Sequence, residues 1–244
     1  AESHVDRSIV DSRPFIETNV MGTQTLLDVV RHAGDTRFIH VSTDEVYGSL
    51  SLEEPKLRFA ETTPIQANSP YSASKAASDL LVLSYHHTFG IDAVITRCSN
   101  NFGAYQFPEK LIPLFVTNLI ESHKVPLYGD GKNVRDWLHV SDHCQAVDLL
   151  IEKATSGEVY NIGGDHSMTI GEVLELLKGM STCKIDHVVD PSLLRASDVT
   201  LQIPDSSRFR AATGWRPRIS TENTLSDLLN YHRELVRRRQ KVRL

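Results

Sequence analysis

Short apolar segments alternate along this chain with longer amphipathic ones, and the apolar segments end in polar residues. Segment 38–41 (Phe-Ile-His-Val) is followed by Ser-Thr-Asp-Glu, and segment 93–97 (Ala-Val-Ile-Thr-Arg) by Cys-Ser-Asn-Asn. Between them, residues 71–89 predict a helix that Gly90 ends. Strands that alternate with helices in this way build a parallel sheet covered by helices. The sequence therefore predicts a doubly wound α/β fold, with ligand sites where the strands end.

Two carboxylates follow the first of these strands directly. Asp44 and Glu45 are adjacent, so on an extended chain their side chains would point to different sides. We expect them to face different atoms of one substrate and to act as a separate acid and base. The alternative for such a pair, taken alone, is a solvated turn.

A tyrosine and a lysine lie four residues apart at the start of the predicted helix. Tyr71 and Lys75 share one helix face, because residues 68–70 (Asn-Ser-Pro) form a helix start signal. An ammonium group beside a phenol favours the phenolate, so we expect Lys75 to lower the pKa of Tyr71. The spacing alone is common in helices, and it gains weight from its joint occurrence with Asp44 and Glu45.

Together these residues resemble the extended short-chain dehydrogenase/reductase family, and within it the nucleotide-sugar 4,6-dehydratases. The Thr-Asp-Glu triplet of these enzymes matches residues 43–45, and their Tyr-x-x-x-Lys pair matches Tyr71 and Lys75. Further matching blocks lie at residues 1–8, 98–103 and 129–137. The resemblance is dense to about residue 164 and looser afterwards. Epimerases of the same family usually lack the Asp-Glu pair, so the triplet is the most specific signal.

The resemblance implies a Rossmann-like parallel sheet and a smaller C-terminal substrate lobe. The dinucleotide-binding domain would cover residues 1–165, and the substrate-binding lobe residues 166–244 with a contribution from residues 103–126. NAD would be the cofactor and a nucleotide-diphosphate hexose the substrate. Members that act on dTDP-glucose, forming its 4-keto-6-deoxy derivative, are the most similar.

The resemblance also implies a mechanism. Tyr71, as phenolate, would take the proton of the sugar 4-hydroxyl during oxidation at C4, with Lys75 holding the phenolate and the cofactor ribose. Glu45 would then remove the C5 proton, and Asp44 would protonate the departing 6-hydroxyl. Thr43 would steady the 4-oxygen. Plain oxidation needs only the Tyr/Lys pair, whereas elimination needs an acid and a base as well.

Binding residues follow from the same resemblance. The expected cofactor contacts are Thr18, Tyr71, Lys75 and Asn101. The expected substrate contacts are Ser3, Thr43, Asn100, Lys110, Leu111, Tyr128 and Arg135. Structural alternatives stay open for four of them: ordinary helix packing for Thr18, an Asx turn for Asn100 and Asn101, and an ion pair with Asp136 for Arg135.

The C-terminal part leaves the nucleotide base open. Residues 194–199 (Leu-Arg-Ala-Ser-Asp-Val) and 204–208 (Pro-Asp-Ser-Ser-Arg) stand where dTDP-glucose dehydratases usually carry Asp-Arg-Pro-Gly-His-Asp-Arg-Arg-Tyr. They are more similar to the tail of GDP-sugar dehydratases and reductases, so a GDP- or UDP-sugar is an alternative substrate. An epimerase or decarboxylase of the same family and a non-catalytic sugar-nucleotide binding domain are the alternative functions.

The glycine-rich turn that cradles a dinucleotide pyrophosphate is not found in these 244 residues. The nearest match, Gly129-x-Gly131, is followed by Val134 where a third glycine would stand. Members of the family carry this turn in a segment ahead of the residues matched here. We therefore expect an N-terminally truncated part of a longer enzyme, inactive by itself.

Composition and spacing limit the partners. The formal net charge of −5 argues against nucleic acid, and no apolar run approaches the ~20 residues of a membrane helix. The three cysteines show no paired spacing and fit a reducing cytoplasm as buried thiols. His139 and His143 have a zinc-like spacing, but no second ligand pair follows, so we expect no metal. By analogy with relatives we expect a homodimer through helices at 15–32 and 71–89.

Overall fold

The computed structural model describes residues 1–181, 187–190 and 199–242, which fall into two compact units. Of the described residues, unit 1 contains 1–99, 143–163 and 199–216, and unit 2 contains 100–142, 164–181, 187–190 and 217–242. The domain boundary predicted near residue 165 lies next to one of the points where the chain crosses from one unit to the other. The chain also returns to unit 1 at 199–216, which the sequence assigned to the substrate lobe. Which ligand each unit binds remains a prediction.

Three parallel strands form the sheet of unit 1, in the order β1-β2-β6. Their bounds are β1 (Phe38–Thr43), β2 (Ala93–Cys98) and β6 (Val159–Ile162). All six residues of the central strand β2 are buried. Because the strands are parallel, their carboxyl ends meet at one edge, where Thr43 pairs with Cys98 and Cys98 with Ile162. The predicted strands and their common edge are confirmed.

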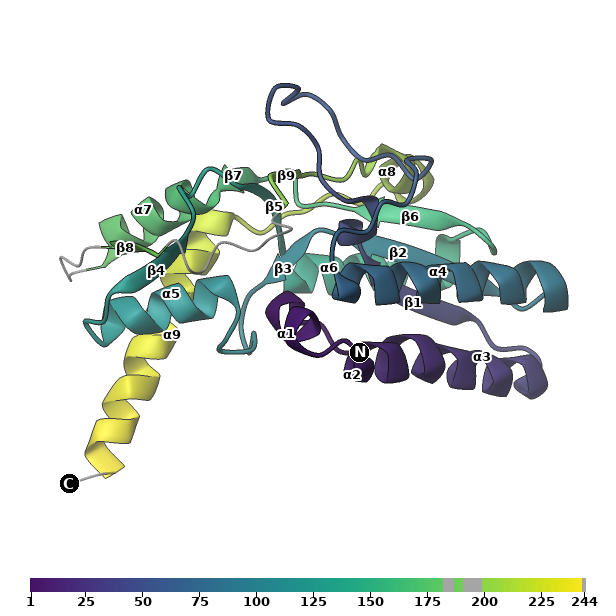
Figure 1. Ribbon diagram of the computed structural model, residues 1–244, viewed down its shortest axis with the longest axis horizontal. Helices are drawn as coiled ribbons and strands as arrows, with labels where there is room; N and C mark the ends of the chain where they lie inside the picture. The colour runs from purple at the N-terminus through teal and green to yellow at the C-terminus, as the bar shows by residue number, and fades with distance from the viewer. Residues whose placement is uncertain (182–186, 191–198, 243–244) are drawn as a thin grey trace. The chain divides into compact units, whose positions relative to one another are not determined.

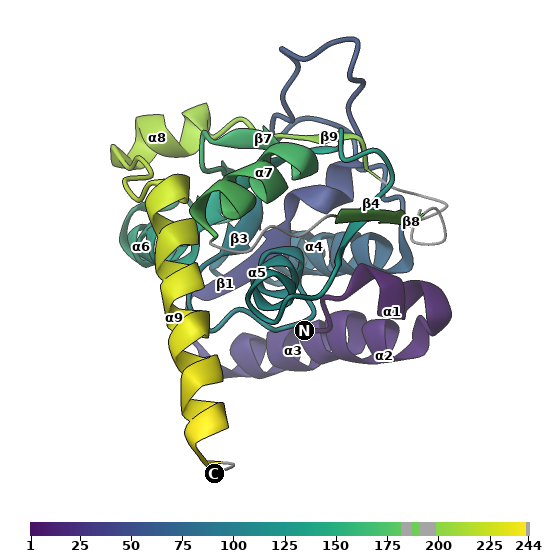
Figure 2. The ribbon, with the colours of Figure 1, turned by 90° about the vertical axis from the view of Figure 1, so that its left-hand side faces the viewer.

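Helix α4 (Pro70–Phe89) carries the predicted Tyr/Lys pair and has strong local signals at both ends. The Ser69 hydroxyl accepts from the Ser72 backbone N–H at 3.1 Å, and the Ser72 hydroxyl accepts from the Ser69 N–H at 3.0 Å. Pro70 occupies the first helical position, and Gly90 ends the helix with φ +70°. The predicted helix is confirmed. Helices α3 and α4 lie on one side of the sheet and α6 (Val140–Lys153) on the other (Figure 2).

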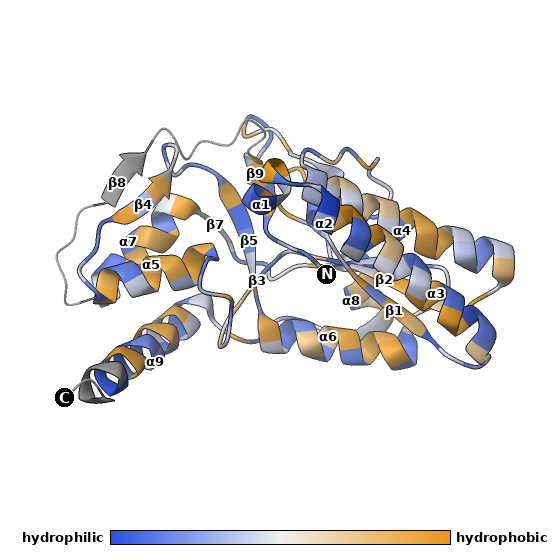
Figure 3. Cartoon of the chain, turned by 60° about the horizontal axis from the view of Figure 1, so that its bottom comes forward, coloured by the Kyte–Doolittle hydropathy of each residue, from blue (hydrophilic) through white to orange (hydrophobic). Residues whose placement is uncertain are grey.

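The helix predicted at 15–32 consists of three consecutive segments. These are α2 (Arg13–Phe15), the π-helix η1 (Ile16–Met21) and α3 (Gly22–Ala33). Of the apolar residues of the predicted helix, Leu27 is buried, whereas Ile16, Leu26 and Val29 are between 45% and 61% exposed. The apolar positions are thus divided between the core and the surface. Apolar and polar residues both occur along α3, as the hydropathy colouring shows (Figure 3).

Unit 2 has its own hydrophobic core. Helices α5 (Leu111–Ile120), α7 (Ile170–Met180) and α9 (Thr221–Val242) pack against one another around it (Figure 2). Its largest side chains are Phe102, Phe115, Leu119, Trp137, Leu174, Leu177 and Leu225. The strands of this unit are β3 (Asn100–Phe102), β4 (Val125–Tyr128), β5 (Val134–His139), β7 (Ser167–Thr169) and β8 (His187–Asp190). β5 pairs in parallel with β3 and antiparallel with β7, a strand that the sequence did not predict.

The remaining elements of unit 1 are short (Figure 1). They are α1 (Val5–Val10), the 3-10 helix η2 (Asp44–Tyr47), β9 (Leu201–Gln202) and α8 (Ser207–Thr213). The block 194–199 whose likeness to GDP-sugar enzymes left the base open lies, except for Val199, outside the described residues.

The prediction that all three cysteines are buried is wrong. Cys98 is a buried free thiol, but Cys144 on α6 is exposed, and Cys183 lies outside the described residues. Position 144 lies on the outer side of α6, an amphipathic helix. The exposure of Cys144 therefore follows from its position on the helix and not from the reactivity of its thiol. None of the helices in the described part of the chain combines the length and apolar character needed to cross a membrane.

Candidate active site

The Thr-Asp-Glu triplet lies where β1 ends and the chain turns into η2. The Thr43 hydroxyl caps this turn by accepting from the Glu45 backbone N–H at 3.2 Å. Asp44 and Glu45 therefore lie on a helical turn. The prediction that the backbone is extended at these two residues is wrong. They still differ in environment, because Asp44 is 2% exposed and Glu45 is half-buried.

The Asp44 carboxylate is held by a side chain from a distant part of the sequence. The Gln202 amide Nε2 donates to Asp44 Oδ1 at 2.6 Å, across 158 residues, and both side chains are buried. Gln202 was not among the site residues predicted from the sequence. No local pattern marks a glutamine in a two-residue strand as a partner of a carboxylate so far along the chain.

Tyr71 and Lys75 approach the same end of β1 from α4. Lys75 Nζ donates to the backbone oxygen of Val41 at 2.8 Å. Burial, followed by the charge of Glu45, raises the pKa of Tyr71 well above its usual value, and a hydrogen bond with Thr43 opposes the rise. The expected lowering of the Tyr71 pKa by Lys75 is therefore wrong for this structure. Burial dominates the phenol, and the ammonium is directed at a backbone carbonyl.

A buried ion pair lies one helical turn beyond the site lysine. The Asp79 carboxylate accepts from Arg97 Nε at 2.8 Å and lies 3.4 Å from His40 Nε2. Arg97 also donates to the Tyr47 hydroxyl at 2.9 Å, which in turn donates to Asn161 at 2.8 Å. The chain of contacts joins α4 to all three strands of the unit 1 sheet and to η2. Asp79 follows Lys75 at helical spacing, a signal that the sequence analysis did not use.

Removing this carboxylate should strongly destabilise the fold. Asp79 is 0% and Arg97 3% exposed, so Asp79→Ala leaves a buried guanidinium without its counter-charge, which costs about 3–5 kcal/mol of unfolding free energy. Asp92→Ala is the matched control, because Asp92 pairs with Arg37 where the side chains are 40% and 25% exposed. It should cost about 0–1 kcal/mol. Urea unfolding followed by circular dichroism measures both, and equal losses would contradict the assignment.

Asn19 ties the N-terminal residues to α4. Its amide donates to the Ser74 hydroxyl at 2.9 Å and forms two hydrogen bonds, of 2.9 and 3.0 Å, with the backbone of Glu2. Thr18 and Ser3, the residues predicted here to bind cofactor and substrate, are exposed. Their roles remain predictions, whereas Asn19 is the residue of this segment that positions the helix of the site.

Three predicted substrate or cofactor residues lie on neighbouring strands of unit 2. Asn100 and Asn101 begin β3, and Arg135 lies on its partner β5. The register pairs Asn100 with Trp137, two residues along the strand from Arg135, a separation of roughly 7 Å. An Arg135 guanidinium nitrogen donates to the Val134 backbone oxygen at 3.0 Å. Two amides and a guanidinium thus gather in one sheet.

The alternative role of Arg135, as the partner of Asp136, competes with other contacts. Asp136 is 1% exposed and accepts from the backbone N–H groups of Gly164 at 2.6 Å and His166 at 3.0 Å. A carboxylate with two backbone donors of this kind has a structural role of its own. The role of the neighbouring Arg135 remains a prediction.

The other predicted nucleotide contacts lie at the ends of elements in unit 2. Lys110 is the N-cap residue of α5, and Leu111, its first residue, packs partly against the hydrophobic core. Tyr128 is the last residue of β4 and pairs with Asp190 of β8. Contacts of these residues with a nucleotide remain predictions.

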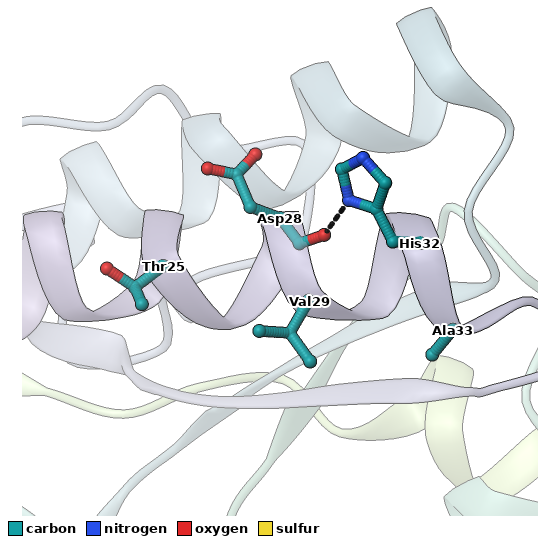
Figure 4. A pocket seen from close by; sticks show the side chains of 5 residues that line it. All are labelled: Thr25, Asp28, Val29, His32 and Ala33. Carbon is teal, nitrogen blue, oxygen red and sulfur yellow. Dashed lines mark hydrogen bonds between the residues drawn. The ribbon is translucent and has the colours of Figure 1, made fainter.

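A hollow on the surface of α3 is separate from the predicted site. It is lined by Thr25, Asp28, Val29, His32 and Ala33 (Figure 4). Asp28 and His32 point to one side of the helix and Val29 to the other, and none of the predicted site residues lines the hollow. Within the parts of the chain that the structure describes, no group of three or more His, Cys, Asp or Glu side chains could hold a metal ion.

The sequence profile of the GDP-mannose 4,6 dehydratase family matches residues 1–228. The chain belongs to this family. Relatives of this family member include the dTDP-glucose 4,6-dehydratase of an Actinoplanes species, 48% identical over 236 residues that make up 96% of this chain and 71% of the relative. The enzyme of the same name from Streptomyces antibioticus is 48% identical over 234 residues, 96% of this chain and 68% of the relative.

Solved structures confirm the Rossmann-like α/β fold of this dehydratase family member. A double mutant of dTDP-glucose 4,6-dehydratase from Streptomyces venezuelae, crystallised with NAD, is 44% identical with a TM-score of 0.89, covering 96% of this chain and 71% of that one. UDP-glucose 4-epimerase from Thermotoga maritima, crystallised with UDP-glucose, has the same TM-score at 27% identity, covering 97% and 76%. Dehydratases and epimerases share the fold, so the side chains of the site must separate the two activities.

Proposed function

We propose that this protein is an NAD-dependent nucleotide-sugar 4,6-dehydratase, a hydro-lyase, and that it converts dTDP-glucose to dTDP-4-keto-6-deoxyglucose. The observation that carries the proposal is a pair of carboxylates in unequal environments at the strand end that Tyr71 and Lys75 approach. Oxidation of a hydroxyl needs only the Tyr/Lys pair, whereas loss of water needs a further acid and base. The names of the relatives at 48% identity support dTDP-glucose as the substrate.

The donor set of unit 1 fits a nicotinamide dinucleotide. The Lys75 ammonium, which donates to the Val41 backbone oxygen of β1, can also donate to ribose hydroxyls, and Tyr71 and Thr43, hydrogen-bonded to each other, supply hydroxyl groups. When bound, NAD⁺ would accept the hydride from C4 and, as NADH, return it to C6, and its positive charge would favour the Tyr71 phenolate. Thr18 and Asn101 are the further cofactor contacts that we propose.

The side chains of unit 1 then divide the proton transfers among themselves. Tyr71 accepts the proton of the 4-hydroxyl, while Thr43 holds the 4-oxygen. The resulting 4-keto group acidifies C5, and Glu45, which is half-buried, removes the C5 proton. Asp44, which is 2% exposed, donates its proton to the departing 6-hydroxyl. The two carboxylates thus act in one elimination.

Substrate binding falls mainly to unit 2 in this proposal. The Arg135 guanidinium matches the charge and geometry of a diphosphate, and the Asn100 amide, on the neighbouring strand, can donate to the same group. The complete set that we propose is Ser3, Thr43, Asn100, Lys110, Leu111, Tyr128 and Arg135. A GDP-sugar is the second candidate substrate, because the matching family is described as GDP-mannose 4,6 dehydratase.

Product analysis tests the activity and the base together. The full-length protein is incubated with NAD and, separately, with dTDP-glucose, GDP-mannose and UDP-glucose, and the products are weighed by mass spectrometry. We expect a product lighter by one water from dTDP-glucose. An isomer of unchanged mass would identify an epimerase, an activity that occurs on the same fold. No conversion, together with no NAD in the purified protein, would identify a non-catalytic binding domain.

We also propose a homodimer through the exposed apolar faces of α3 and α4. The two helices pack side by side in unit 1 (Figure 1). Leu26 and Val29 on α3 and Leu80 on α4 are 57%, 61% and 57% exposed. Monomers rarely expose extended apolar patches, and a two-fold axis would pair this face with its own copy. A cytoplasmic location is proposed from the free thiols of Cys98 and Cys144.

Charges placed on this face should dissociate the dimer. The double variant Leu26→Glu, Val29→Glu buries two carboxylates at the interface, where unpaired charges are costly. Light scattering after size exclusion should therefore give the monomer mass for the variant and the dimer mass for the parent. Ile151→Glu is the control, because Ile151 on α6 is similarly exposed, at 53%, and its variant should stay dimeric. A dimeric double variant would contradict the proposed interface.

A further inference from the structure

The segment that carries Gln202 is hydrogen-bonded on both sides to the stretch that follows η2. The Leu50 backbone N–H donates to the Leu201 oxygen at 3.0 Å, and the Phe59 N–H donates to the Ile203 oxygen at 3.0 Å. These contacts flank Gln202 directly, so its backbone has little freedom to shift. A side chain that starts from such a backbone position can hold another group in one orientation.

The Gln202 side chain uses this position to reach the carboxyl group of Asp44. Its Nε2 lies 2.6 Å from Asp44 Oδ1, and the two residues are 1% and 2% exposed, so water does not compete for the contact. An ionised carboxylate only accepts hydrogen bonds, so the NH₂ end of the amide must face it. An amide nitrogen only donates, and the carbonyl oxygen of a carboxyl group accepts better than its hydroxyl oxygen. The bond therefore favours Oδ1 as the carbonyl oxygen and Oδ2 as the oxygen that carries the acid proton of Asp44.

We propose that Gln202 is a positioning residue for water elimination, which holds Asp44 through Oδ1 so that Oδ2 presents the proton to the 6-hydroxyl. The inference rests on the proposed function, which makes Asp44 the acid. In the step, the Oδ2–H bond breaks and the proton joins the 6-oxygen, while the C6–O bond breaks and its electron pair leaves with water. The C5 proton passes to Glu45, and its bonding electrons form the C5=C6 bond.

Gln202 also stabilises what the step leaves behind. Once the proton has left, Asp44 is a carboxylate in a buried position, and a buried charge without a donor is unfavourable. The neutral amide supplies that donor without adding a charge of its own. Loss of this bond should therefore slow elimination and leave the earlier oxidation at C4 unaffected, since oxidation uses Tyr71 and Lys75.

Single-turnover kinetics of Gln202→Met, made in the full-length enzyme, test this separation. Methionine has a similar length and is apolar, so it fills the space without donating a hydrogen bond. We expect NADH absorbance to rise at a rate within about twofold of the parent rate. Its decay should be about 10- to 100-fold slower, which is the effect on a rate of losing one hydrogen bond to a charged group. The dehydrated product should appear with the same slow rate.

A matched control removes a hydrogen bond of the same segment that does not touch the acid. The Thr200 hydroxyl donates to the Leu50 backbone oxygen at 2.9 Å, and Thr200→Val removes this contact. If the segment matters only for folding, Thr200→Val and Gln202→Met should lower the melting temperature and slow both kinetic phases alike. We expect Thr200→Val to leave the ratio of the two phases unchanged.

The variant Gln202→Glu keeps the shape of the side chain and gives a pH readout. The introduced carboxyl can donate to Asp44 only when it is protonated, so elimination should recover as the pH falls, whereas Gln202→Met should show no such recovery. Decay of NADH at the parent rate in Gln202→Met, or equal slowing of both phases, would overturn the inference. A parent enzyme that forms no dehydrated sugar would instead overturn the proposed function itself.

Discussion

The double variant Asp44→Asn, Glu45→Gln should lose water elimination by at least ~10², the lower end of what a general acid or base contributes. Oxidation at C4 precedes elimination and depends on Tyr71 and Lys75, which the variant retains. NADH should therefore build up in a single turnover and persist. The amides keep the size of the carboxyl groups, and the asparagine oxygen can still accept from Gln202, so the fold should survive.

A second pair of adjacent carboxylates in the same unit provides the control. Glu53 and Glu54 are both exposed in the loop between η2 and α4, and Glu53→Gln, Glu54→Gln changes the net charge by the same amount as the site variant. This control should form the 4-keto-6-deoxy sugar at the parent rate. If the site variant did so too, Asp44 and Glu45 would not be the acid and base, and the epimerase alternative would move ahead.

The variant Tyr71→Phe should abolish oxidation at C4 and leave substrate binding close to normal. The hydroxyl transfers the proton, a contribution of about 10²–10⁴ in rate, whereas the ring supplies packing. That packing includes an edge-on contact with Phe15 at 6.3 Å between ring centroids, which phenylalanine retains. We expect turnover to fall at least ~10²-fold, with no NADH phase at all, and binding calorimetry to give a similar affinity for the nucleotide sugar.

Tyr85 on the same helix is the matched control for the loss of a phenol. Its hydroxyl donates to Asp28 at 2.6 Å, beside the surface hollow of α3 and away from the triplet. Tyr85→Phe should turn over at the parent rate. Turnover of Tyr71→Phe within tenfold of the parent would show that another base accepts the 4-hydroxyl proton. NADH absorbance distinguishes Tyr71→Phe, which should form no NADH, from the double variant Asp44→Asn, Glu45→Gln, in which NADH should build up and persist.

Much of the candidate site could be predicted because its parts follow local signals. The start of α4 is marked by Ser69 and Pro70 and its end by Gly90, so the four-residue spacing of Tyr71 and Lys75 translates directly into one helix face. Buried strands are recognised by apolar residues, and parallel strands end at one edge of a sheet. The residues after β1 could therefore be assigned to a site without knowing their neighbours.

Other features could not be predicted, because they depend on residues that meet only in the folded chain. Gln202 reaches Asp44 across 158 residues. Burial, not Lys75, governs the pKa of Tyr71, and burial is a property of everything packed around the phenol. The π turn at Ile16–Met21, which divides the predicted helix into segments, is not revealed by apolar periodicity.

By itself, the sequence determined the strands β1 and β2 and the helix α4 between them, the position of the triplet at a strand end and the shared face of Tyr71 and Lys75. These depend on steric and hydrogen-bonding preferences that act within a few residues. The tertiary structure alone decided that Asp44 is buried against Gln202 and that Asp79 joins α4 to the sheet through Arg97. The reason is physical: burial and long-range hydrogen bonds arise only when distant segments exclude water together.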